Sequence, residues 1–238
     1  MVDALASGAS DLYGRGSSSL LLGTINCLDR TQTMAIYLHD GDLPKGVKLG
    51  KVIAVDTETM GLNPHRDRLC LVQLSAGDGD AHLVRLPKGK YNAPNLKRIL
   101  SDPKTLKIFH FARFDLAVLK KYLKLDATPV YCTKIASKLA RTSSDRHGLK
   151  DLCRELIGIE ISKQQQCSDW GADTYEQAQL EYAASDVLYL HQLKEKLDKL
   201  LKRESRTHLA QASFDFLPYR AEMDLLGWED TDIFSHSA

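Results

Sequence analysis

A strongly apolar segment of this chain runs directly into two acidic residues. Residues 52–55, Val-Ile-Ala-Val, are apolar and mostly β-branched, which predicts a buried strand, and Asp56-Thr57-Glu58 follows at once. Residues two apart on a strand point to the same side, so Asp56 and Glu58 share a face. Buried charge is costly unless it is paired or binds a metal, and carboxylates suit Mg²⁺ or Mn²⁺. The segment predicts either a metal site at a strand end or a strand edge that runs into an acidic turn.

Strand patterns dominate the first half of the chain and helix patterns the second. Apolar runs predict strands at 36–38, 52–55, 69–74, 82–86, 107–111 and 130–131. The turn sequence Gly77-Asp78-Gly79-Asp80 indicates that the second to fourth of these form an antiparallel meander. Helix patterns cover 95–101, 113–123, 133–140, 147–157, 174–203 and 206–225. This order favours an α/β fold in which helices flank a mixed sheet.

Local signals mark two places in the later helices. Asp173 or Thr174 is expected to cap the long helix at 174–203, with Gln177 completing a capping box. Pro218 is expected to kink or break the last helix, because proline has no backbone N–H and clashes with the preceding turn.

The first 33 residues differ from the rest of the chain. They contain small, flexible stretches and no signal-peptide pattern. We interpret residues 1–33 as a disordered leader, an upstream extension or a cloning remnant, with a targeting or docking arm as the alternative. Residues 34–238 are expected to form a single folded domain.

Composition places the chain among ordinary globular proteins. It has 238 residues, of which 43% are hydrophobic and 26% charged, and no apolar run approaches the roughly 20 residues that cross a bilayer. Five irregularly spaced cysteines without a CxxC pair argue against a zinc site or a disulfide scaffold. Reduced thiols in a cytoplasmic protein are expected. A net charge of +1 predicts that any nucleic acid is held at a confined site rather than along a basic surface.

Two further acidic residues have unremarkable local explanations when taken alone. Asp115 falls in the first turn of the helix after 107–111, where acidic residues often complement the helix dipole. Tyr182 and Asp186 are four apart on a later helix and so share a face, as a surface pair also would. Each becomes a candidate for the same site as Asp56 and Glu58 only through the combination.

That combination resembles a known family. An Asp-x-Glu pair on a first strand, an aspartate after a central strand and Tyr-x-x-x-Asp on a late helix are similar to the DEDD 3′–5′ exonucleases with tyrosine. Ser168-Asp169-Trp170-Gly171, ahead of that helix, resembles the ribonuclease D branch. The resemblance implies a ribonuclease H-like sheet, antiparallel in its first three strands and then parallel, within one exonuclease domain. It also implies two divalent ions, Mg²⁺ or Mn²⁺, and nucleoside 5′-monophosphate products.

The same resemblance implies a role for each catalytic residue. Asp56 would bridge both ions, Glu58 and Asp186 would hold the ion that carries the attacking water, and Asp115 would help to position the second. Tyr182 would orient that water, because a phenol with a pKa near 10 is a poor base at neutral pH.

The segment 56–69 and the short length after the late helix resemble the NrnC family of oligoribonucleases. This likeness implies short single-stranded RNA as the substrate, cleaved down to mononucleotides, and a ring-shaped octamer. Leu62 would be a wedge between two bases. The implied substrate contacts are Thr59, Met60, Gly61, Leu62, His65, Arg66, His110 and Trp170. Core packing for Leu62, His110 and Trp170, and a solvated loop for His65 and Arg66, are the alternatives.

Two rival functions use the same residues. A DNA-directed repair or proofreading exonuclease, or a ribonuclease D type that acts on longer structured RNA, would need the same acids. A catalytically dead relative that binds RNA is disfavoured, because all four acids and the tyrosine are present.

Overall fold

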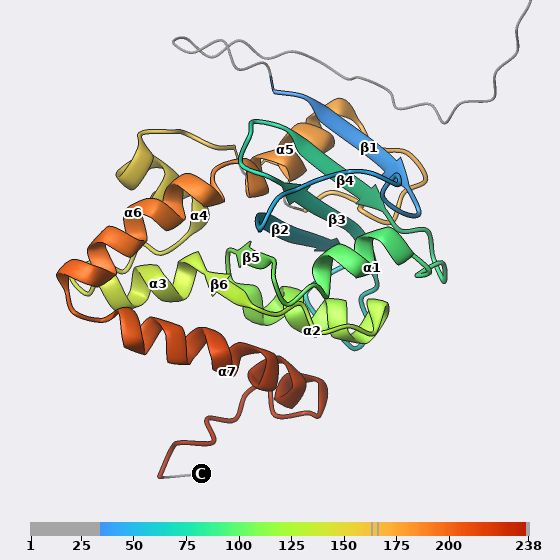
Figure 1. Ribbon diagram of the computed structural model, residues 1–238. Helices are drawn as coiled ribbons and strands as arrows, with labels where there is room; N and C mark the ends of the chain where they lie inside the picture. Colours follow the sequence, from blue (N-terminus) through green and yellow to red (C-terminus); the bar gives the residue numbers. More distant parts are fainter. Residues whose placement is uncertain (1–33, 163, 166, 237–238) are drawn as a thin grey trace, which may run out of the picture.

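The computed structural model describes residues 34–162, 164–165 and 167–236, which form one six-stranded sheet with helices on both faces (Figure 1). The predicted leader, residues 1–33, lies outside the described residues. The strand order is β1-β4-β3-β2-β5-β6. Their bounds are Ile36–Asp40 for β1, Val52–Thr59 for β2, Leu69–Ser75 for β3, Ala81–Arg85 for β4, Leu106–Phe109 for β5 and Val130–Cys132 for β6.

The directions of the strands follow the predicted pattern. Strands β2, β3 and β4 form the antiparallel meander, whereas β5 pairs parallel to β2 and β6 parallel to β5. The N-terminal strand β1 pairs parallel to β4 and forms the other edge. This is the mixed sheet of a ribonuclease H-like fold, and the predicted fold class is confirmed.

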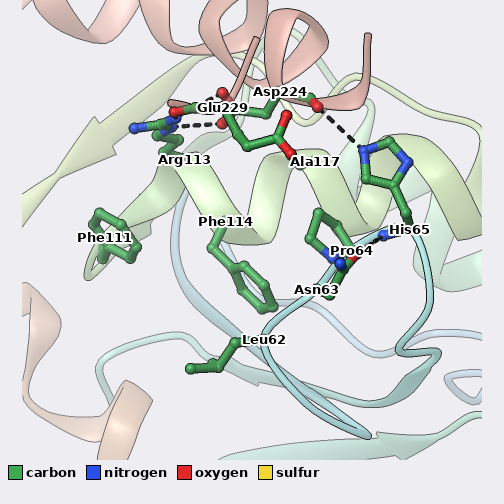
Figure 2. Close-up of a pocket in the computed structure, with 10 residues that line it drawn as sticks. All are labelled: Leu62, Asn63, Pro64, His65, Phe111, Arg113, Phe114, Ala117, Asp224 and Glu229. Atoms are coloured by element: carbon green, nitrogen blue, oxygen red, sulfur yellow. Dashed lines mark hydrogen bonds and ion pairs between the residues drawn. The ribbon is translucent and has the colours of Figure 1, made fainter. Parts of the chain in front are cut away.

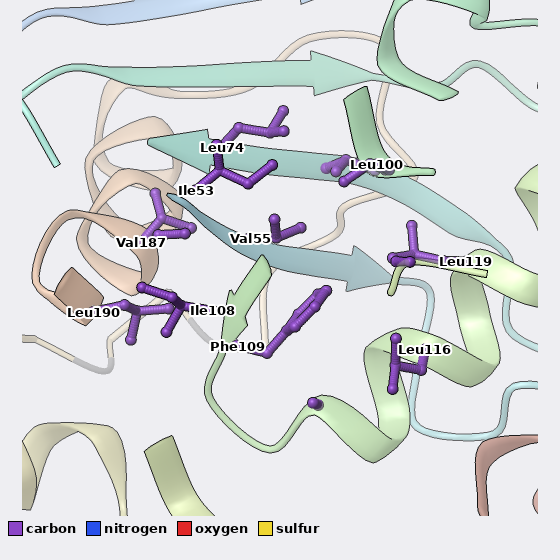
Figure 3. Close-up of a cluster of buried hydrophobic side chains, with 14 of the residues drawn as sticks. Ile53, Val55, Leu74, Leu100, Ile108, Phe109, Leu116, Leu119, Val187 and Leu190 are labelled. Atoms are coloured by element: carbon purple, nitrogen blue, oxygen red, sulfur yellow. The ribbon is translucent and has the colours of Figure 1, made fainter. Parts of the chain in front are cut away.

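The core lies between the sheet and the helices on its two faces. Strand β3 is buried along its whole length, as expected for a strand covered on both sides. Figure 3 shows Ile53 and Val55 of β2 and Phe109 of β5 among buried side chains from the sheet and its covering helices. Burial of these side chains fixes the end of β2, which places the acidic residues that follow Val55.

The helices lie close to their predicted positions. Helices α1 (Pro94–Leu100), α2 (Ala112–Leu123) and α3 (Thr133–Ala140) alternate with the last strands. The short α4 (Leu149–Leu152) continues into a π-helical turn, Cys153–Ile157. Helices α5 (Gln177–Leu188), α6 (Leu190–Arg203) and α7 (Thr207–Leu225) complete the described chain. None of the helices in these described residues is long and apolar enough to span a membrane, and a cytoplasmic location stays a prediction.

Two expectations about the late helices are wrong, and the break that was one of two alternatives at Pro218 is not observed. The segment 174–203 is two helices, because Tyr189 ends α5 and begins α6. The capping box at the start of α5 is made by Glu176 and Gln179, not by Asp173 or Thr174 with Gln177. Pro218 lies inside α7 without ending it. Tertiary packing overrides the local signal there, because Phe214, Leu217 and Ala221 bury one side of the helix around the proline.

Candidate active site

Three of the four predicted acids meet at the end of β2. Asp56 and Glu58 point from one face of the strand toward Asp186 on α5, and a carboxylate oxygen from each lies within 4.8 Å of the others. They line a cleft of about 590 Å³ together with Asp115 and Tyr182. The cleft thus collects side chains from β2, α2 and α5, which are far apart in the sequence.

Charge repulsion within this cluster indicates the kind of ligand that the cluster can bind. Burial raises the pKa of Asp56 well above its usual value, and the charges of Asp115, Asp186 and Glu58 raise it further. Burial also raises the pKa of Glu58, followed by the charges of Asp186 and Asp115. Like charges held this close are stable together only when protons or cations offset them. A cluster of hard oxygen ligands without a cationic side chain among them fits a divalent metal ion.

Asp115 reaches the cleft from a different direction. It lies in the first turn of α2, is 3% exposed, and accepts a 2.7 Å hydrogen bond from the Thr57 hydroxyl. Thr57 points to the face of β2 opposite Asp56 and Glu58, since side chains alternate along a strand. Burial raises the pKa of Asp115 to about 7, although the hydrogen bond from Thr57 lowers it. The metal-sized cluster therefore contains three acids, with Asp115 beside it.

Tyr182 lies one helical turn before Asp186 on α5. Its pKa is raised above the usual value by burial and then by the negative charges of Asp186, Glu58 and Asp56. The phenol therefore stays protonated at neutral pH and is suited to hydrogen bonding rather than to removing a proton. Its ring lies 6.1 Å, centroid to centroid, from that of Trp170, which is only 2% exposed.

Most of the predicted substrate contacts line the same cleft. They are Thr59, Met60, Gly61, Leu62, His110 and Trp170. Leu62 is 88% exposed, so it is not a core residue. Trp170 packs against Tyr182 and Tyr175, which matches the packing alternative. The His110 ring shares a hydrogen bond of 2.9 Å with the Thr133 hydroxyl.

His65 and Arg66 do not line the cleft itself, although His65 lines a neighbouring pocket, and their contact with substrate stays a prediction. Arg66 forms an ion pair with its neighbour Asp67, with a 2.6 Å contact. The His65 ring hydrogen-bonds to the backbone carbonyl of Asp224 at 3.2 Å. Asp67 also accepts a hydrogen bond from the backbone N–H of Asn63, which closes the loop on itself.

Several residues that line the cleft were not predicted from the sequence. Lys134 and Lys150 add positive charge to its rim, Cys167 adds a free thiol, and Phe111 and Phe114 add aromatic surface. Gln73, opposite Asp56 on β3, places its amide nitrogen 3.4 Å from that carboxylate. The lysines carry no motif and depend on the position of α3 and α4. Gln73 had a signal, as a polar residue within the apolar run 69–74.

A second, smaller pocket adjoins the cleft. This side pocket has a volume of about 260 Å³ and shares Leu62, Phe111 and Phe114 with the cleft. Figure 2 shows Arg113, Asp224 and Glu229 grouped together, apart from Leu62. Arg113 donates two hydrogen bonds to the Asp224 carboxylate, at 2.5 and 2.7 Å, and a third to the Glu229 carbonyl.

Comparison with known proteins assigns this arrangement. The sequence pattern of the family described as 3′–5′ exonuclease matches residues 42–202. The chain belongs to the 3′–5′ exonuclease family. Within the family, it is 34% identical to ribonuclease D of Gluconacetobacter diazotrophicus over 154 residues, which are 65% of this chain and 39% of that protein. The chain thus spans about two fifths of the length of that curated ribonuclease D relative.

The solved structures include closer matches. Brucella melitensis NrnC is 57% identical, with a TM-score of 0.83 over 85% of this chain and 98% of that one. The same protein bound to pGG is 56% identical, with a TM-score of 0.82 and the same coverage. Escherichia coli ribonuclease D is 28% identical, with a TM-score of 0.64 over 72% of this chain and 45% of that one. The predicted membership in the ribonuclease D-like exonucleases, near NrnC, is confirmed.

Proposed function

We propose that this exonuclease degrades short single-stranded RNAs from their 3′ ends to nucleoside 5′-monophosphates. The observation that carries the proposal is the carboxylate cluster of Asp56, Glu58 and Asp186 in a confined cleft. Similarity to an NrnC structure that holds pGG supports a short substrate. The near-zero net charge agrees with recognition at one site rather than along a long polyanion.

Divalent ions are part of the proposal. Asp56, Glu58 and Asp186 would hold them, with Asp115 beside the cluster, and a Brucella melitensis NrnC structure with bound Mg²⁺ supports this assignment. A pair of such ions, Mg²⁺ or Mn²⁺, supplies neutralisation of charge on the phosphate and activation of a water nucleophile.

The other residues of the cleft would bind the substrate and orient the water and the carboxylates. The protonated Tyr182 hydroxyl would hold the attacking water in line with the phosphorus, and its raised pKa supports a role as a hydrogen-bonding group. Met60, Gly61 and Leu62 form the lip of the cleft, where the 3′-terminal nucleotide would lie. Thr57 hydrogen-bonds to the carboxylate of Asp115, and Gln73 to that of Asp56; these bonds would orient the two acids.

The test compares substrates by length and sugar. The protein is incubated with Mg²⁺ or Mn²⁺ and with 5′-labelled dinucleotides, short oligonucleotides and long RNA, beside matching DNA. Preference for RNA dinucleotides, with 5′-monophosphate products, is the expected result. Preference for long duplex DNA, or for structured RNA, would assign the site to the repair or ribonuclease D alternative.

We also propose, from the resemblance to NrnC, that the chain assembles into a ring-shaped octamer. Exposed apolar side chains on α7 and the segment after it would supply contact surface, namely Tyr219, Leu226, Trp228 and Phe234. Measurement of the mass in solution tests this assembly.

A further inference from the structure

Phe111 has a backbone conformation that aromatic residues rarely adopt. It links β5 to α2 with φ 68° and ψ 43°, in the left-handed region. A bulky side chain in this region is strained, and such strain persists where the surrounding structure or a function maintains it. The side chain gains little burial in return, because Phe111 remains 45% exposed.

The exposed ring lies where the two pockets meet. Phe111 lines both the cleft and the side pocket, as do Leu62 and Phe114. The ammonium of Lys134 lies 4.4 Å from the centre of the Phe111 ring, and Lys134 also lines the cleft. The strained backbone thus presents an aromatic surface, accompanied by positive charge, at the junction.

The C-terminal segment forms one wall of the side pocket. The guanidinium of Arg113 is occupied by the Asp224 carboxylate and the Glu229 carbonyl. Two acidic residues, Asp224 and Glu229, line the pocket beside this single arginine. That balance of charge suits an uncharged flat group and opposes a further phosphate.

We propose that Phe111 is a specificity-determining residue that stacks on the base of the nucleotide preceding the 3′-terminal one, and that the side pocket receives this base. The proposal rests on the proposed function, because it requires a short nucleic acid in the cleft. Leu62, at the same junction, then separates this base from the terminal one. Bases stack on aromatic side chains without strong sequence preference, so the pocket would select for the presence of a base and not for its identity.

The experiment is a cycle of two enzymes and two substrates. Phe111→Asn removes the ring, and asparagine suits both the left-handed backbone and the helix N-cap, so the thermal midpoint should not fall. The substrates are an RNA dinucleotide and the same molecule with an abasic 5′ nucleoside. In the wild type, loss of the base should lower kcat/KM about tenfold, mainly through KM. In Phe111→Asn the dinucleotide should show that same loss, and removal of the base should cost little more.

Equal losses on base removal in the wild type and in Phe111→Asn would overturn the proposal. Phe111→Tyr should keep most of the wild-type preference for the base, because it keeps the ring, whereas a role in backbone geometry alone predicts that Phe111→Asn keeps this preference as well. Leu209→Ala, which truncates an exposed apolar side chain on α7, serves as the matched control and should behave as wild type. Failure of the proposed function looks different, because the wild type would then prefer long duplex DNA or structured RNA to either of these two substrates.

Discussion

The hydroxyl of Thr57 donates a 2.7 Å hydrogen bond to the carboxylate of Asp115, 58 positions further along the chain. Both residues are buried, at 7% and 3% exposure. The contact ties the strand that carries Asp56 and Glu58 to the helix that carries Asp115. The placement of Asp115 beside the cluster therefore depends on a residue that is not itself an acid.

Thr57→Val should weaken metal binding and turnover. The change keeps the shape of the side chain but removes the donor, so the pKa of Asp115 rises further and its orientation loosens. Loss of a residue that orients a metal ligand costs roughly 10–100-fold in affinity or activity. Titration with Mg²⁺ by calorimetry checks the affinity, and Thr57→Ser should restore it. Wild-type affinity in Thr57→Val would show that the bond is incidental.

Stability of the metal-free protein should fall as the pH rises. In the unfolded chain these carboxyls ionise near pH 4, whereas folding raises the pKa values of Asp56, Glu58 and Asp115, the last to about 7. The folded state thus holds protons more tightly, so the contribution of these groups to stability is lost as the pH passes through their folded pKa values. Thermal midpoints in chelator between pH 5 and 8 test this, and added Mg²⁺ should remove most of the slope. A flat profile in chelator would contradict it.

Asp56→Asn should abolish turnover while raising the stability of the metal-free protein. The amide removes one negative charge from the cluster and cannot act as a charged ligand. At pH 8, in chelator, the thermal midpoint should rise by a few degrees, because repulsion is relieved. Calorimetric scans and dinucleotide cleavage are measured on the same preparation. Retained cleavage by Asp56→Asn would refute the assignment of the site.

Tyr182→Phe should show whether Tyr182 orients the attacking water or contributes to metal binding. The ring and its packing against Trp170 remain, but the hydroxyl is lost. We expect kcat to fall about 100-fold, the scale of a lost positioning group, while Mg²⁺ affinity stays unchanged. Because the pKa of Tyr182 is raised, the wild-type rate should not show an ionisation of this phenol below pH 10. A loss of Mg²⁺ affinity in the variant would assign Tyr182 to the metal site instead.

The sheet and the pair Asp56 and Glu58 were predictable from short-range patterns, whereas Asp115 and Asp186 were predicted through the resemblance to the exonucleases. Alternating and continuous apolar runs define the meander, and Asp56 with Glu58 follows from strand geometry. The break at Tyr189 was not predictable, since no glycine or proline marks it and the packing of α6 away from α5 decides it. The partnership of Thr57 with Asp115 and the exposed ring of Phe111 depend on elements distant in sequence, which one-dimensional patterns do not register.

The helix break at Tyr189 separates two parts of the fold that have different packing partners. Tyr182 and Asp186 belong to α5, which packs on β2, β3 and β4, whereas α6 packs mainly on α3 and α7 mainly on α2. Helix α7 packs on α2, which carries Asp115, and Asp224 at its end lines the side pocket. The later helices therefore brace one half of the site and α5 the other, so a replacement of the chain after α5 would leave Tyr182 and Asp186 in place but remove the support of Asp115 and of the side pocket.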